Sequence, residues 1–316
     1  MVKTSSIYVA GHKGMVGSAI IRTLKNSGYN NITTSSSSEL DLRIQFDVEN
    51  FFQKHKPEYV FIAAAKVGGI LANNNYRAEF IYDNIMIQSN LIKACKNHNV
   101  KKTVFLGSSC IYPKLSNQPI KEEYLLTGTL ESTNEPYSIA KIAGLKMCES
   151  FYKQYGSEFI SLMPTNLYGP NDNYDLQNSH VIPALIKKIY DAKQKSKSHV
   201  SIWGSGNPKR EFLHVDDLAQ ACIFFINEIC AKTIYDQFNV SHINIGTGTD
   251  ITIKMLAKLI CKTVDYNGEL KFDTEKPDGT PRKLLDISIA NQLGWKPRIV
   301  LKDGIKDTVK NFISNL

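Results

Sequence analysis

The sequence has no long apolar run, and no stretch approaches the roughly 20 apolar residues that span a membrane. It is 316 residues long, 42% hydrophobic and 22% charged, which is ample material for a buried core. The first residues, Met1–Ser5, lack the apolar stretch of a secretory signal. We therefore expect a globular protein of the cytoplasm without a membrane partner.

Closely spaced cysteine pairs and concentrated charge are also missing. The six cysteines are scattered, so neither a zinc site nor a disulfide framework is expected. The 38 basic and 30 acidic residues give a net charge of +8, but the basic residues are dispersed. Their densest run, Lys187–Lys197, contains few aromatic residues and is typical of a solvated helix end. This pattern favours small anionic ligands over nucleic acid as partners.

A glycine-rich turn follows the first apolar segment, Ser6–Ala10, and precedes a helical pattern. Strand, glycine turn and helix in this order are typical of dinucleotide binding, because the helix N-terminus offers free N–H groups to a pyrophosphate. The spacing is Gly-x-x-Gly-x-x-Gly, so a plain glycine-rich turn is the alternative. The candidate cofactor residues of this turn are Gly11, His12, Lys13, Gly14, Met15, Val16 and Gly17.

The end of the second predicted strand, Ile32–Thr34, bears on which nicotinamide cofactor fits. An acidic side chain about 20 residues beyond the glycine turn binds a ribose 2′-hydroxyl and repels a 2′-phosphate. Ser35–Ser38 occupy this segment, with no acid before Glu39. Because Lys13 can reach a phosphate, the sequence favours NADPH over NADH.

Apolar strand-like segments then alternate with helical patterns. Strands at 59–63, 103–106 and 159–163 with helices between them predict an α/β fold with a Rossmann-type, doubly wound parallel sheet. We expect an NADP-binding domain over residues 1–170, joined by parts of 211–250, and a smaller C-terminal α/β substrate domain over 171–316.

Tyr137 and Lys141 lie four positions apart in a helical pattern, so both side chains project from one face. An ammonium beside a phenol favours the phenolate and lowers the tyrosine pKa, which makes the phenol a usable proton donor near neutral pH. The alternative is a half-buried tyrosine beside a solvated lysine.

The glycine turn, Ser108 after a predicted strand, and the Tyr137/Lys141 pair together resemble the extended short-chain dehydrogenase/reductase family. The resemblance implies that the Ser108 hydroxyl binds a substrate carbonyl and that Tyr137 donates or abstracts a proton. It also implies that Lys141 binds the cofactor ribose and tunes Tyr137.

Longer segments narrow the resemblance to one branch of that family, among them Gly107–Lys114, 178–183 and 277–283. Members of this branch are homodimers that epimerise C3 and C5 of GDP-4-keto-6-deoxy-D-mannose and reduce C4 with NADPH, giving GDP-L-fucose. The resemblance assigns the proton transfers of epimerisation to Cys110 and His180, two residue types that titrate near neutrality. Without the family, a buried thiol and a loop histidine are the simpler interpretations.

The same resemblance implies further contacts. For the GDP part, cations suit the pyrophosphate and a flat or polar partner suits the guanine, although each such residue also fits a plain surface position. The implied cofactor residues also include Leu40, Asp41, Ala63, Ala64, Ala65, Leu106, Gly107, Tyr137, Lys141, Pro164, Thr165, Asn166, Leu167 and His180. The implied substrate residues are Ser108, Ser109, Cys110, Lys188, Trp203, Arg210 and Asp278.

The sequence departs from the family at three places. Members commonly carry arginine at position 13 and another arginine in the segment that Ser35–Ser38 occupies here. A 2′-phosphate would then be held by a point charge and hydroxyls instead of a guanidinium fork, which weakens the NADPH preference. Position 188 is a lysine where arginine is frequent, which is a milder change.

Alternative functions remain open. Another nucleotide-sugar epimerase/reductase or a 4,6-dehydratase uses the same scaffold, but a dehydratase typically has Asp-Glu where this chain has Ser109-Cys110. A regulatory protein that senses the cofactor without chemistry usually lacks the Tyr137/Lys141 pair.

Overall fold

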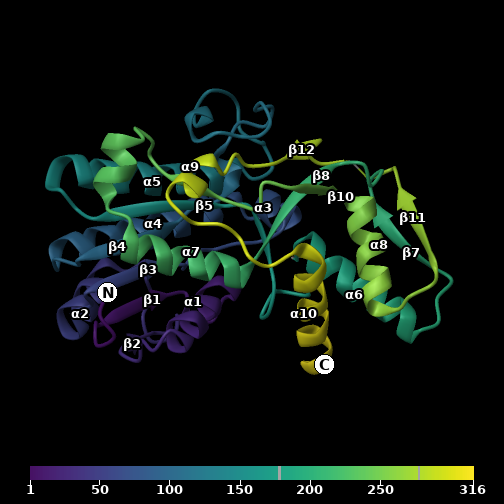
Figure 1. The fold of residues 1–316 in the computed structure, drawn as a ribbon, viewed down its shortest axis with the longest axis horizontal. Helices are drawn as coiled ribbons and strands as arrows, with labels where there is room; N and C mark the ends of the chain where they lie inside the picture. Colours follow the sequence, from purple (N-terminus) through teal and green to yellow (C-terminus); the bar gives the residue numbers. More distant parts are fainter. Residues whose placement is uncertain (177–178, 277) are drawn as a thin grey trace.

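The computed structural model describes residues 1–176, 179–276 and 278–316. Asn178 and Pro277, which belong to two of the segments that carry the resemblance, lie outside the described residues. Figure 1 shows the main sheet with its helices on the left, and a second group of elements on the right.

The main sheet has six parallel strands in the order β2-β1-β3-β4-β5-β9. The strand order reverses beside β1, and in sheets of this kind the crevice at the carboxyl ends of the strands binds the ligand. The Rossmann-type parallel sheet predicted from the sequence is therefore confirmed. Its strands are β1 (Ile7–Ala10), β2 (Ile32–Thr33), β3 (Tyr59–Ile62), β4 (Lys102–Leu106), β5 (Phe159–Pro164) and β9 (Ile243–Ile245).

Helices cover both faces of this sheet, so its strands are buried on both sides. Ile7 and Val9 of β1 join one apolar cluster, whereas Tyr8 and Ala10 join the cluster on the opposite face. This follows from the alternation of side chains along a strand. One face carries α1 (Met15–Asn26) and α7 (Val215–Glu228), and the other carries α2 (Gln45–His55), α4 (Arg77–Asn97) and α5 (Glu135–Tyr155).

A second group of elements, with its own apolar cluster, lies at the carboxyl-terminal side of the chain. Its four-stranded sheet has the order β10-β8-β12, with β6 paired to β8, and β7 pairs with β11 in a separate ladder. The strands are β6 (Asn166–Tyr168), β7 (His199–Trp203), β8 (Lys209–His214), β10 (Asp250–Thr252), β11 (Glu269–Asp273) and β12 (Arg282–Lys283), and the helices are α6 (Val181–Gln194), α8 (Ile253–Val264) and α10 (Leu301–Ser314).

Several short elements were not predicted. Leu40 and Leu42 pack on the core of the main sheet from a loop without strand structure. The elements that sequence patterns missed include α3 (Ile70–Asn75), α9 (Ser288–Gln292), the short helices η1 (Ser109–Ile111), η2 (Glu122–Tyr124) and η3 (Thr233–Gln237), and the strands β7, β11 and β12. The domain division at residue 170 stays a prediction.

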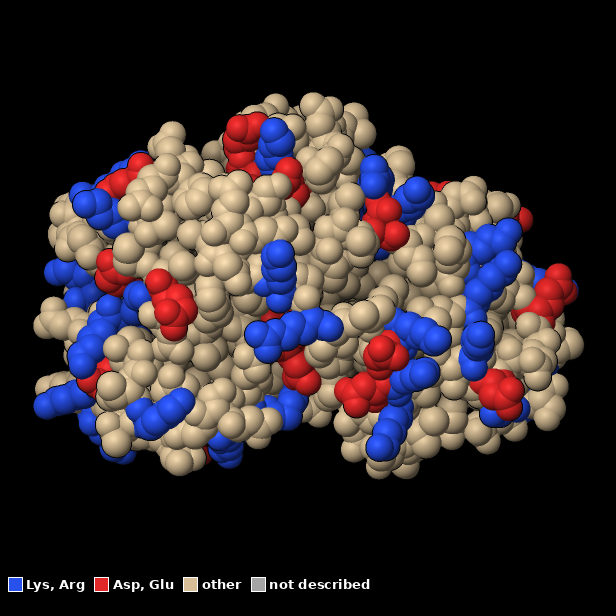
Figure 2. Space-filling view, viewed as in Figure 1, with Lys and Arg blue, Asp and Glu red and all other residues tan. Residues whose placement is uncertain are grey.

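No helix in the described ranges is long and apolar enough to cross a membrane. Within the same ranges, no group of three His, Cys, Asp or Glu side chains could hold a metal ion. On the face shown in Figure 2, Lys and Arg side chains lie over both halves of the molecule, with Asp and Glu side chains among them.

Candidate active site

The glycine turn between β1 and α1 packs closely on the end of β3. Gly11 has a φ of +86°, and a Cβ there would lie 2.6 Å from the Ala64 nitrogen. A Cβ on Gly17 would lie 2.1 Å from the Gly11 oxygen, whereas one on Gly14 would meet that oxygen at 3.5 Å, an ordinary contact. Gly11 and Gly17 are therefore needed for close packing, whereas Gly14 leaves room in front of α1.

The N-terminus of α1 suits an anion. In the described structure α1 has neither a capping side chain nor an acidic residue in its first turn, so its first N–H groups are available. Ala63, Ala64 and Ala65, which follow β3, are half-buried and small. This arrangement fits the pyrophosphate of a dinucleotide beside the turn.

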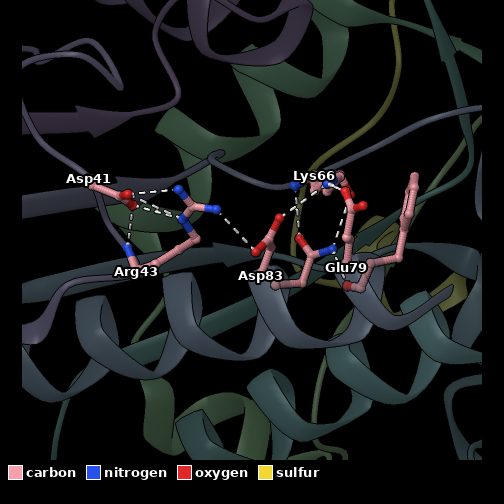
Figure 3. A network of polar contacts seen from close by, with 7 residues as sticks. Asp41, Arg43, Lys66, Glu79 and Asp83 are labelled. Atoms are coloured by element: carbon pink, nitrogen blue, oxygen red, sulfur yellow. Dashed lines mark hydrogen bonds and ion pairs between the residues drawn. The ribbon is translucent and has the colours of Figure 1, made fainter. Parts of the chain in front are cut away.

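Asp41, a predicted cofactor residue, lies in a chain of charged contacts along α4 (Figure 3). Arg43 Nη2 lies 2.7 Å from Asp41 Oδ2, and this contact lowers the pKa of Asp41. Arg43 Nη1 is 3.3 Å from Asp83 Oδ1, and Asp83 also contacts Lys66, which pairs with Glu79. The loops that follow β2 and β3 are thus joined through α4.

The end of β4 delivers Ser108 to the crevice. A Cβ on Gly107 would lie 2.1 Å from the Met163 methyl carbon, so a larger residue there would have to displace the Met163 side chain. Ser108 has extended backbone and begins η1, and its hydroxyl accepts a hydrogen bond of 3.3 Å from the Cys110 nitrogen. Ser109, predicted to contact substrate, is buried.

Tyr137 and Lys141 lie in α5, as predicted. The ring of Tyr137 packs edge-on against Phe80, with the centroids 6.4 Å apart. The Ser108 side chain lies beside the phenol and opposes the rise in its pKa. Lys141 is buried, and its Nζ donates a hydrogen bond of 2.8 Å to the Leu106 oxygen. This Nζ lies 5.9 Å from the centroid of the Tyr137 ring.

The predicted lowering of the tyrosine pKa by the lysine is wrong for this structure. Burial raises the pKa of Tyr137, and Cys110 adds to the rise. Burial also lowers the pKa of Lys141 to about 8. The Lys141 ammonium donates its hydrogen bond to the Leu106 oxygen. It therefore does not offset the rise in the pKa of Tyr137 that burial causes. Tyr137 is consequently a neutral phenol at pH 7, which still carries its proton but is a weaker acid than a tyrosine in water.

Two donors that the sequence did not predict surround the Cys110 sulfur. Asn134 Nδ2 lies 3.3 Å from it and Lys283 Nζ lies 3.7 Å from it. Lys283 ends the segment 277–283 that carries the resemblance, and Asn134 stands just before α5, the helix of Tyr137 and Lys141. His180 is the N-cap residue of α6, and its side chain is exposed.

The predicted contacts to GDP gather around the end of β7. The Trp203 side chain is 62% exposed, and the ammonium groups of Lys188 and Lys276 lie 5.3 and 5.9 Å from its ring centroids. A second lysine, Lys276, was not predicted. Such cation–π pairs pre-position positive charge beside a flat surface.

The Asp278 carboxylate binds Ser205 in the turn after β7. Its Oδ1 accepts from the Ser205 nitrogen at 2.9 Å and its Oδ2 from the Ser205 hydroxyl at 2.6 Å. It also attracts the Arg210 guanidinium, which donates a 2.8 Å hydrogen bond to the Lys209 oxygen. Asp278 therefore fastens its own loop to the turn after β7, next to Arg210.

Glu211 is a buried residue that the sequence did not bring out. Its carboxylate accepts hydrogen bonds from the backbone nitrogens of Thr247, Gly248 and Leu285, at 2.6, 2.7 and 2.9 Å. Its backbone oxygen accepts from the Asn166 side chain at 2.8 Å. One side chain thus joins β8 to the segments that follow β9 and β12.

Three more of the predicted cofactor residues lie on or between β5 and β6. Thr165 Oγ1 is 3.4 Å from the Glu211 oxygen, Pro164 ends β5, and Leu167 lies in β6. Leu40 is buried.

A parallel nucleotide-binding sheet with a Ser-Tyr-Lys group at its carboxyl edge defines a class of nicotinamide-dependent enzymes. The chain belongs to the NAD dependent epimerase/dehydratase family, whose model matches residues 7–241. The family predicted from the sequence is thereby confirmed.

Within this family the chain is similar to GDP-L-fucose synthases. It is 54% identical to a putative GDP-L-fucose synthase 2 of Arabidopsis thaliana, over 99% of this chain and 93% of the relative. It is 52% identical to a GDP-L-fucose synthase of Escherichia coli strain K12, over 98% and 97%. A solved GDP-mannoheptose C4 reductase from Campylobacter jejuni with NADP bound has a TM-score of 0.92 and 43% identity, covering 99% of both chains.

Proposed function

We propose that this chain converts GDP-4-keto-6-deoxy-D-mannose to GDP-L-fucose, by epimerising C3 and C5 and reducing C4 with NADPH. The observation that carries this proposal is the position of Cys110, whose backbone nitrogen donates a 3.3 Å hydrogen bond to the Ser108 hydroxyl and whose side chain acts on the Tyr137 phenol. A carbonyl-binding pair and a second acid/base group therefore lie side by side. Identities of 52–54% to GDP-L-fucose synthases support the substrate.

For the reduction, Ser108 and Tyr137 bind the C4 oxygen, and Tyr137 gives it a proton. NADPH supplies the hydride to C4 when it is bound. Gly14 and the open N-terminus of α1 hold the pyrophosphate. Lys141 would contact the ribose of the cofactor, and its ammonium would keep one positive charge in the site, which favours the negative charge that develops on the C4 oxygen.

For epimerisation, a proton must leave C3 or C5 on one face and return on the other. We assign these transfers to Cys110 and His180. Between them the C4 oxygen carries enolate charge, which the Ser108 and Tyr137 hydroxyls stabilise. Asn134 and Lys283 hold the sulfur in place with two donors.

We assign the GDP part to the surface around Trp203. Lys188, Lys276 and Arg210 provide positive charge for the pyrophosphate, and the exposed indole offers a flat face to the base. Asp278 then orients this surface through Ser205.

The experiment is incubation of the purified protein with NADPH and GDP-4-keto-6-deoxy-D-mannose, with the product identified by NMR. We expect stoichiometric NADPH consumption and GDP-L-fucose. Reduction without inversion would instead make the chain a C4 reductase, as the Campylobacter jejuni neighbour is described. Absence of turnover at high enzyme concentration contradicts both.

We further propose a homodimer that pairs α4 and α5 with their copies. Tyr82 of α4 is 62% exposed and Ile139 of α5 is 42% exposed, so both helices carry apolar surface away from their own contact. A monomeric mass by light scattering contradicts this arrangement. The six unpaired cysteines of the described structure support a reducing compartment, and hence the cytoplasm.

We also propose that the substrate domain comprises the second group of elements, with β9 and α7 returning to the NADP-binding domain. The interspersed surface charges support small anionic ligands as the partners, and neither nucleic acid nor membrane is proposed.

A further inference from the structure

A buried hydrogen-bond chain begins two residues beyond Cys110. The Tyr112 hydroxyl lies 2.6 Å from His242 Nε2 and 2.5 Å from Asn244 Oδ1, and all three side chains are buried. His242 Nδ1 in turn lies 3.0 Å from the Ser241 hydroxyl. These contacts join the end of η1 to β9.

The direction of each hydrogen bond in this chain follows from the chemistry of its groups. The Asn244 amide nitrogen donates to the Ile120 and Asp286 oxygens, at 3.0 and 3.1 Å, which leaves the amide oxygen for Tyr112. A phenol has a single proton, so Tyr112 donates to Asn244 and accepts from His242. His242 therefore carries its proton on Nε2, and burial, which lowers its pKa to about 3, keeps the ring neutral.

Asn244 joins three segments of the protein. Its backbone nitrogen in β9 donates to Glu122 Oε1 at 3.0 Å, and its side chain binds the Ile120 and Asp286 oxygens. The amide oxygen and both amide hydrogens are thus used. Such a buried chain strongly favours one arrangement, because a shift would leave a polar group without its partner.

Lys283 is held by the same contacts. The nitrogen of its neighbour Leu284 donates to Gln118 Oε1 at 2.8 Å, and the Leu284 oxygen accepts from the Ile120 nitrogen at 2.7 Å. Ile120 is also the residue whose oxygen binds the Asn244 side chain. The far end of the hydrogen-bond chain therefore lies beside Lys283.

We propose that Tyr112 is a positioning residue that holds Cys110 and Lys283 at their 3.7 Å contact. Its backbone follows η1, which carries the cysteine, and its hydroxyl binds Asn244, which holds the segment of the lysine. The ammonium stays beside the sulfur only while this chain is intact. This inference rests on the proposed function only for the use of Cys110 in epimerisation.

Tyr112→Phe removes the hydroxyl and keeps the ring. The first measurement is the rate at which iodoacetamide alkylates Cys110 at neutral pH, followed by mass spectrometry of its peptide, without substrate or cofactor. Iodoacetamide reacts with a thiolate, which a neighbouring ammonium favours. We expect Tyr112→Phe and Lys283→Met each to slow alkylation by about two- to fivefold, the size of one screened charge interaction. Unchanged or faster alkylation in Tyr112→Phe overturns the proposal.

The double variant, Tyr112→Phe with Lys283→Met, shows whether the phenol acts through the lysine. If it does, the two losses are not additive, and the double variant is alkylated at the rate of Lys283→Met alone. A further loss as large as that of Tyr112→Phe would mean that the hydroxyl acts on Cys110 without the lysine, which contradicts the proposal.

Tyr235→Phe is the matched control, because it also removes one buried phenol hydroxyl. The Tyr235 hydroxyl donates a 3.0 Å hydrogen bond to the oxygen of Phe159, which begins β5 at the opposite edge of the sheet. This variant should leave the alkylation of Cys110 unchanged. An equal loss there would assign the effect to general destabilisation and refute the role of Tyr112.

Gln118→Leu replaces Tyr112→Phe in the test if the latter does not fold. It removes the hydrogen bond to Leu284 at a partly exposed side chain. Alkylation of Cys110 should slow in the same direction, and an unchanged rate overturns the proposal.

Epimerisation provides the second measurement. Tyr112→Phe should slow solvent-deuterium incorporation at C3 and C5 by at least about twofold, part of the loss that removal of the lysine causes. NADP⁺ binding, measured by calorimetry, should be unchanged. Wild-type exchange rates in Tyr112→Phe contradict the proposal. Because alkylation needs no sugar, absence of exchange in the wild type would count against the proposed reaction alone and leave the alkylation result readable.

Discussion

The Lys283 ammonium lies 3.7 Å from the Cys110 sulfur, although 173 positions separate the two residues in the chain. β12, which carries Lys283, pairs in parallel with β8, and the bond from Leu285 to Glu211 anchors the segment beyond it. The second sheet therefore brings a positive charge to a thiol that the first sheet presents.

Replacing this ammonium should impair epimerisation selectively. Lys283→Met is expected to slow solvent-deuterium incorporation at C3 and C5 by at least about tenfold, the scale at which acid/base groups contribute. NADPH binding should be unchanged. Lys276→Met is the matched control, because Lys276 contacts Trp203. This variant should raise the KM for the GDP-sugar without slowing exchange in the bound state. Equal exchange rates in Lys283→Met and the wild type would contradict the role.

The pH dependence of reduction should report Lys141. Burial lowers its pKa to about 8, so the ammonium is present below that pH and is lost as pH rises through it. We expect kcat/KM for NADPH to fall above pH 8. In Lys141→Arg the side chain stays charged, so the residual activity should lose its alkaline decline. A flat wild-type profile from pH 7 to 9 is the outcome that refutes this assignment; the fluorescence of bound NADPH provides a check on binding.

Tyr137→Phe should slow both half-reactions. Removal of the phenol deletes the proton donor for C4 and one of the two hydroxyls at the enolate oxygen, so reduction should fall by about 100-fold or more. Deuterium exchange at C3 and C5 should fall as well. Ser108→Ala provides the comparison, since it removes the other hydroxyl. Normal exchange in Tyr137→Phe would confine the phenol to reduction.

The glycine turn can be tested with two alanine variants. Gly11 and Gly156 both have positive φ, +86° and +68°, but a Cβ at Gly156 would meet nothing within 4 Å. Gly156→Ala should lower the free energy of unfolding by about 1 kcal/mol. Gly11→Ala adds a collision with the Ala64 backbone and should lower it by about 2 kcal/mol or more. Urea unfolding measures both, and equal losses would show that the contact with β3 is dispensable.

Local patterns sufficed for much of the fold. The start of α8 is set by a local cap, because the Met255 nitrogen donates a 3.1 Å hydrogen bond to the Thr252 hydroxyl. The apolar runs of β1, β3, β4 and β5 are likewise readable, since strands buried on both faces are almost continuously hydrophobic. The glycine turn and the Tyr137/Lys141 pair are each contained within a few residues.

What the sequence could not give depends on distant contacts. β12 is two residues long, and only its pairing with β8 brings Lys283 to Cys110. The buried position of Glu211 depends on three separate segments meeting there. For Tyr137, the spacing to Lys141 was read correctly, but the sign of the pKa shift depends on burial and on the Leu106 oxygen that captures the ammonium.

The carboxylate of Glu211 also has a consequence for motion. The amides of Thr247, Gly248 and Leu285 all donate to this one carboxylate. We therefore expect the exposure of one amide to water to be coupled to the exposure of the other two. Hydrogen–deuterium exchange of the three amides should then occur through one cooperative opening, with the same free energy of opening for each.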